Sequence, residues 1–155
     1  MRRSKSRSQA VPAILLGGSI AGVLDITYAF VFYGSRGVRP IRILQSIAGG
    51  LLGARAYKGG LGTAALGLGL HFLIALGAAT VYYAASRKLT FLRRQAVASG
   101  LLYGIAVYLF MNQIVIPLSA FPRGRFSMSA TVTGVIVHML FIGLPISLAV
   151  RHYSK

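Results

Sequence analysis

Four long apolar stretches constrain the fold of this chain more than any other feature of its sequence. They cover about residues 12–34, 61–85, 96–118 and 128–150, and basic or turn residues bound each of them. An α-helix needs about 20 apolar residues to cross the hydrocarbon core of a bilayer, whereas a barrel strand needs about ten. The sequence therefore predicts an all-α integral membrane protein, folded as a single membrane domain with a four-transmembrane-helix bundle.

The composition agrees with a membrane protein. Hydrophobic residues make up 55% of the chain and charged residues only 12%, which is too few to cover a water-exposed surface. Residues 1–11 are basic and precede the first apolar stretch, as in a signal peptide. Because that stretch continues to about Gly34 without a clean cleavage site, we favour an uncleaved first span behind a basic cytoplasmic tail.

The segment at about residues 40–56 is too short to span comfortably, and it separates into two faces on a helical wheel. The apolar face contains Ile41, Leu44, Ile47, Ala48, Leu51 and Leu52. The opposite face contains Arg42, Gln45, Ser46, Gly49 and Gly53. This pattern predicts an amphipathic helix that is interfacial or re-entrant, although a fifth span stays possible.

The distribution of the Lys and Arg residues favours an orientation with both termini in the cytoplasm. That orientation places ten of them inside: Arg2, Arg3, Lys5, Arg7, Arg87, Lys88, Arg93, Arg94, Arg151 and Lys155. It places seven outside: Arg36, Arg39, Arg42, Arg55, Lys58, Arg123 and Arg125. With a formal net charge of +16 spread over several short loops, we expect anionic phospholipids as the counter-charge, with Arg87, Lys88, Arg93 and Arg94 at the headgroups, and no nucleic acid.

Glycines spaced four apart mark faces where helix backbones can approach closely. They are Gly18 and Gly22, Gly49 and Gly53, and Gly100 and Gly104. Packing within one bundle is the simpler interpretation, and a homo-oligomer or a membrane-protein partner is the alternative.

The only acidic residue, Asp25, lies near the middle of the first span, where an ionised side chain costs about 2.5–3.5 kcal/mol. His71 in the second span and His138 in the fourth lie at a matching depth, and Tyr108 and Asn112 of the third span lie near that level. We expect these five side chains to form one buried polar layer.

A carboxylate with two imidazoles at mid-membrane can act as a proton relay, with Asp25 as acceptor and the histidines as relay or gate. The alternative is a hydrogen-bonded pair that only fixes helix register. Two His and one Asp can also ligate a divalent ion, but their spacing matches no metal motif, and we expect neither a metal nor another cofactor.

Two prolines, Pro117 and Pro145, fall late in the third and fourth spans, where the lost backbone donor predicts a kink. Asn112 and Gln113 precede Pro117 by about one turn and can bond the freed backbone groups or line a cavity. Hydrolase and kinase motifs are missing from the sequence, as is Cys, so we expect a protein that is not an enzyme.

From His71 onward the chain resembles the YagU-like family of small bacterial inner-membrane proteins. The resemblance rests on "LHFLIALGAATVYYAASRKLTFLRRQAVASGLLYGIAVYLFMNQIVIPLSAFP" and "GVIVHMLFIGLPISLAVRH", roughly residues 71–152. It implies a multi-pass inner-membrane protein linked to acid tolerance, with His71, Pro117 and His138 as shared positions. The chain lacks the family's long polar insertion between the first two spans and has the short amphipathic segment there.

These observations predict a proton-responsive small carrier or a pH-sensitive membrane unit. The alternative is an interaction module that packs with partner proteins or binds anionic lipid.

Overall fold

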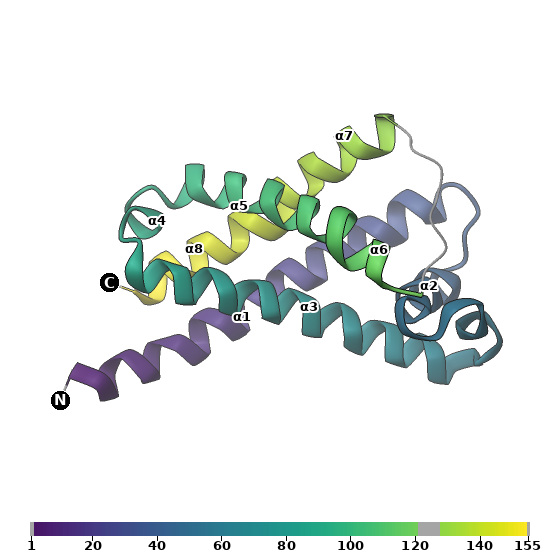
Figure 1. The fold of residues 1–155 in the computed structure, drawn as a ribbon, viewed down its shortest axis with the longest axis horizontal. Coiled ribbons are helices and arrows are strands. Elements are labelled where there is room, and N and C mark those ends of the chain that lie inside the picture. The colour runs from purple at the N-terminus through teal and green to yellow at the C-terminus, as the bar shows by residue number, and fades with distance from the viewer. Residues whose placement is uncertain (1, 121–127, 155) are drawn as a thin grey trace.

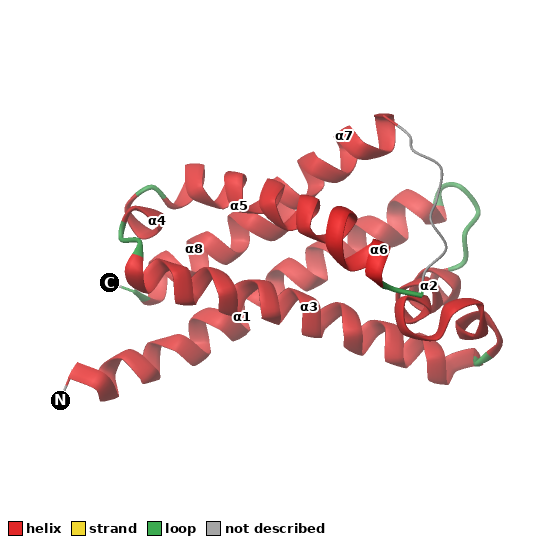
Figure 2. Ribbon diagram, viewed as in Figure 1, coloured by secondary structure: helices red, strands yellow, loops and turns green. Residues whose placement is uncertain are grey.

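The computed structural model describes residues 2–120 and 128–154, and the side chains from Gln9 onward within those ranges. Figure 2 shows helices and no strands over this part of the chain. The elements in order are α1 (Arg2–Gly34), α2 (Pro40–Leu52), η1 (Gly53–Lys58), α3 (Gly60–Lys88), α4 (Phe91–Arg94), α5 (Ala96–Phe110), η2 (Met111–Val115), α6 (Ile116–Leu118), α7 (Met128–Val137), η3 (His138–Gly143) and α8 (Leu144–Tyr153).

Four helical stretches are long and apolar enough to cross a membrane, which confirms the all-α class and the number of long helices. They are Gln9–Gly34, Gly60–Lys88, Ala96–Leu118 and Met128–Tyr153, the last two each running through several elements. Helix α1 begins at Arg2, so most of the expected basic tail continues the first helix.

The long helices pack around a core of small and aromatic residues. Helix α1 packs along α3 and α8, α5 packs on η3 and α8, and α2 packs on the first part of α3 (Figure 1). The start of α1, the short α4 and the end of α8 lie at one end of the molecule, and α2 lies at the other. The central cluster consists of Ala13, Ala21, Ala79, Tyr82, Tyr83, Ile142, Ile146 and Val150.

The turn between α3 and α5 is held by a buried tyrosine. Tyr82 is 1% exposed, and its hydroxyl donates to the Ser99 hydroxyl at 3.0 Å, with the Leu92 carbonyl also 3.0 Å away. Ser99 in turn donates to the Gln95 carbonyl at 2.7 Å. Because a buried hydroxyl is costly unless it is bonded, this network fixes how α3, α4 and α5 follow one another.

Helix α2 is amphipathic, and residues from both of the faces identified in the sequence are buried. Gln45 and Gly49, placed on the polar face, are buried, whereas Leu51 is 64% exposed. The reason is that Gln45 finds backbone acceptors: its Nε2 donates to the Gly60 carbonyl at 3.0 Å and lies 3.4 Å from the Thr63 hydroxyl. Ala48, from the apolar face, is also buried, and its backbone lies against Gly67 of α3. Both faces of α2 therefore contribute to its packing.

The polypeptide after α6 also holds α2. The Ala120 amide donates to the Gly50 carbonyl at 2.9 Å, across the carboxyl end of α2. Gly53, which ends α2, has a φ of 58° and faces Ala120, a backbone conformation that glycine adopts without a Cβ penalty. The end of the third long helix is thereby tied to the amphipathic segment.

Candidate functional site

His71 lies where α3 crosses α1 and bonds the α1 backbone. Its Nε2 is 2.8 Å from the Gly22 carbonyl oxygen, and because a carbonyl only accepts, Nε2 carries the proton in this contact. A ring edge also meets Phe72, with centroids 5.5 Å apart.

His138 lies at the start of η3, on the fourth long helix. Its Nδ1 donates to the Gly134 carbonyl at 2.9 Å. Its ring meets the Tyr108 ring edge-on, with centroids 5.3 Å apart, and the Asn112 side-chain amide donates to the Tyr108 carbonyl at 2.9 Å. The structure thus brings Tyr108, Asn112 and His138 together between α5 and η3.

A π-helical turn lies just before each of the two prolines at which a kink was predicted. Met111–Val115 precedes Pro117, and His138–Gly143 precedes Pro145. A proline ring clashes with the carbonyl four residues back and supplies no N–H, and a wider turn accommodates both. The Asn112 side chain bonds the Tyr108 carbonyl, which is not the carbonyl that Pro117 leaves without a donor, and Gln113 is exposed.

The predicted packing glycines lie at helix crossings within the chain. A Cβ on Gly18 would meet Leu76, and one on Gly22 would meet Phe72 at 2.7 Å. A Cβ on Gly100 would meet Ser147 and the Gly143 backbone, and one on Gly104 would meet the backbone of His138 and Met139. These four faces are therefore occupied by the chain itself.

Asp25 follows Gly22 by three residues and so lies on the same face of α1. Since α1 and α3 run antiparallel, with Gly18 beside Leu76 and Gly22 beside Phe72, Asp25 comes level with the turn before His71. Within the described residues, no hydrogen bond or ion pair joins Asp25 to either histidine.

The expected single buried layer is therefore not what the structure shows. The predicted layer consisted of Asp25, His71, Tyr108, Asn112 and His138, and all five residues are partly exposed. They lie in three separate places: His71 at its contact with α1, Asp25 without a bond to either histidine, and the other three residues together between α5 and η3. Depth along a helix was predictable, but the direction of each side chain around its helix was not. Among the described residues there is no group of three His, Asp or Glu side chains able to hold a metal.

Two cavities open on the surface. An apolar one of about 550 Å³ lies between α2, α3 and the η2–α6 segment, with Ser46 and Ser119 on its wall. A polar one of about 300 Å³ lies at the opposite end and is lined by Thr90, Arg93, Arg94, Arg151 and Ser154.

The second cavity contains residues that the sequence analysis did not group. Arg93 and Arg94 were expected at lipid headgroups, but Arg151, Thr90 and Ser154 were not. The available signal was that Arg151 ends the fourth long stretch on the same side as the "SRKLTFLRR" loop.

Comparisons with known proteins assign no family. No family model, no curated protein and no solved structure matches this chain. The resemblance to the YagU-like family stays a prediction.

Proposed function

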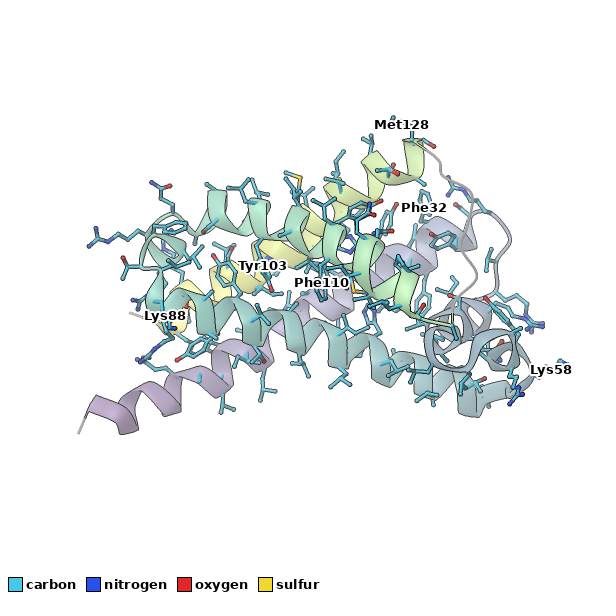
Figure 3. All side chains as sticks on the ribbon, viewed as in Figure 1. Phe32, Lys58, Lys88, Tyr103, Phe110 and Met128 are labelled. Atoms are coloured by element: carbon cyan, nitrogen blue, oxygen red, sulfur yellow. The ribbon has the colours of Figure 1, made fainter. Side chains whose placement is uncertain are left out.

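We propose that the chain is a multi-pass protein of the bacterial inner membrane, with both termini in the cytoplasm, that is not an enzyme. Large apolar side chains exposed on all four long helices support insertion, among them Val31, Leu73, Leu102 and Leu148, because such surface belongs in lipid. Basic residues flank the spans, and Lys58 and Lys88 lie at opposite ends of α3 (Figure 3).

We further propose that the bundle is a pH-sensitive unit, of the kind that the YagU-like resemblance to acid-tolerance proteins implies. The observation that carries this proposal is that each of these histidines uses one ring nitrogen to bond a backbone carbonyl. His71 does so across the α1–α3 contact, and His138 does so within its own helix, beside the ring of Tyr108 on α5. Protonation adds a second N–H to each ring, and imidazole changes charge between about pH 5 and 8.

The titratable groups around these rings are few. Asp25 on α1 is the nearby carboxylate for His71, and Tyr108 on α5 packs on His138. Tyr28 of α1 meets Phe141 of η3, with ring centroids 6.2 Å apart. An imidazolium in an apolar span must be paired or solvated. Because His138 has no carboxylate near it, we expect protonation to loosen the packing of His138 against Tyr108.

The test is amide hydrogen exchange in nanodiscs between pH 5 and 8, corrected for intrinsic exchange. We expect opening around η3 to be about tenfold more frequent at pH 5, equivalent to about 1.4 kcal/mol. His138→Gln removes this response, and His71→Gln alters the response at the α1–α3 contact. His152→Gln is the matched control, because His152 is exposed in the last turn of α8.

A pH response that is absent from the wild type, or that persists in the double variant His71→Gln/His138→Gln, would contradict the proposal. Proton flux into proteoliposomes, compared between the wild type and Asp25→Asn, then separates a carrier from a static sensor. Flux that needs Asp25 assigns a carrier.

A second candidate function is binding of anionic lipid at the basic ends of the bundle. It is favoured over a partner-protein module because Gly18, Gly22, Gly100 and Gly104 already pack within the chain.

A further inference from the structure

The polar cavity at the α4–α8 end gathers three arginines from two parts of the chain. Arg93 and Arg94 come from α4, and Arg151 from the last turn of α8, with the hydroxyl residues Thr90 and Ser154 on the same wall. The cavity has a volume of about 300 Å³. It lies at the end of the molecule where α1 begins and α8 ends (Figure 1).

The charges of this cavity are not balanced by side chains. Guanidinium groups stay protonated in proteins, so three of them cannot relieve their repulsion by losing a proton. The sequence has a single carboxylate side chain, Asp25, which lies in the middle of α1. An anion from outside the chain is the direct way to offset this charge.

Arg93 shows that the cavity is partly desolvated. Its Nη1 donates to the Ser154 carbonyl at 3.4 Å, which ties α4 to the end of α8. Its Nε is buried and has no hydrogen-bond partner among the described residues. A buried N–H of a charged group is costly when it is unpaired.

We propose that this cavity binds a phosphate group, held by Arg93, Arg94 and Arg151 with the hydroxyls of Thr90 and Ser154. Guanidinium forks match phosphate oxygens in pairs, and such charge-assisted bonds are stronger than neutral ones. The proposed site differs from the group of residues that the sequence analysis expected at lipid headgroups. It includes Arg93 and Arg94 of that group and also Arg151, but it does not include Arg87 and Lys88. It deepens the lipid-binding candidate and does not depend on the histidines.

The phosphate has two possible sources, a lipid headgroup or free phosphate. Leu89 and Phe91, on either side of Thr90, are 47% and 53% exposed. Exposed apolar side chains in the turn place the cavity at the level of the headgroups when the bundle is inserted. The experiment has one arm for each source.

The test compares two double variants with equal net charge. Arg94→Gln/Arg151→Gln removes two exposed arginines that line the cavity, and it keeps Arg93 because that residue holds Ser154. Arg87→Gln/Lys88→Gln removes two exposed cations from the end of α3, outside the cavity. Far-ultraviolet circular dichroism and size-exclusion chromatography check that both variants fold.

In one arm, inorganic phosphate is titrated calorimetrically into protein held in phosphatidylcholine nanodiscs. In the other, native mass spectrometry counts phosphatidylglycerol retained from vesicles of mixed phosphatidylcholine and phosphatidylglycerol. We expect the cavity variant to bind at least one of the two probes about tenfold more weakly, and the α3-end variant to change little.

A loss with inorganic phosphate assigns free phosphate, and a loss confined to phosphatidylglycerol assigns a lipid headgroup. Equal weakening in both variants would show diffuse attraction to basic ends and would overturn the site. Binding of neither probe by the wild type would overturn it as well. Neither result depends on the hydrogen-exchange response of His71 and His138, so the two proposals fail separately.

Discussion

The substitution Gly104→Leu is expected to abolish the folded bundle, while Gly77→Leu leaves it intact. Gly104 lies where α5 crosses η3, and a Cβ there would overlap the His138 carbonyl and lie 2.5 Å from the Met139 Cα. Those atoms belong to a backbone and cannot move aside as a flexible side chain can. Even one added methylene in a packed interior costs about 1–3 kcal/mol, and leucine adds four heavy atoms.

The structure around Gly104 leaves no simple route for relaxation. On the facing helix, a Cβ on Gly143 would itself overlap the Gly100 carbonyl, so both backbones are already in close contact. Separating them would also part His138 from Tyr108. The expected result is aggregation, or loss of the cooperative thermal transition followed by circular dichroism in detergent.

Gly77 provides the matched control because no atom lies within 4 Å of a Cβ built there. Both glycines are inside long helices, so helix propensity changes equally at the two sites. If Gly104→Leu melts like the wild type, the α5–η3 crossing is wrong. Gly104→Leu does not test dimerisation specifically, because the substitution disrupts the packing of α5 on η3 within a single chain.

The long helices were predictable because they follow from the thickness of a bilayer and from the cost of unpaired backbone groups in lipid. Those constraints act on a stretch of sequence as a whole. The observed helical stretches Gly60–Lys88 and Ala96–Leu118 lie within three residues of the predicted ranges at both ends.

The candidate site was less predictable because it depends on rotation about each helix axis. His71 was expected in one polar layer with Asp25, and it donates to the backbone of Gly22, one turn before Asp25. A glycine leaves its own carbonyl accessible to a side chain of the crossing helix. Asp25 and Gly22 share a face of α1, so the sequence indicated the depth of this contact and not the atom that accepts the hydrogen bond.

Gln45 illustrates a second limit of helical-wheel reasoning. A helical wheel predicts that a polar side chain faces water, yet Gln45 is 2% exposed and donates to the Gly60 carbonyl. The acceptor comes from a turn fifteen residues later, where Gly60 has a φ of 58°. Such a contact depends on how the chain folds back, and local periodicity carries no information about it.

The packing of α2 on α3 leads to the second large effect, for Gly67→Leu. A Cβ on Gly67 would overlap the Leu44 carbonyl and lie 3.2 Å from the Ala48 amide nitrogen. Here α2 is a short helix that packs on the long helices mainly through α3, so it can move away as a unit. We expect it to detach from α3 at a cost of about 1–3 kcal/mol, without unfolding of the long helices.

Hydrogen exchange of the α2 amides in nanodiscs measures this detachment. An opening cost lowered by that amount accelerates exchange of the α2 amides roughly 5- to 150-fold, while amides of α5 and α8 keep their protection. Gly69→Leu is the control: Gly69 lies on the same helix as Gly67, but a Cβ built there has no neighbouring atom within 4 Å. Unchanged exchange in α2 would mean that the bonds from Gln45 to Gly60 and from Ala120 to Gly50 hold this helix without close packing at Gly67.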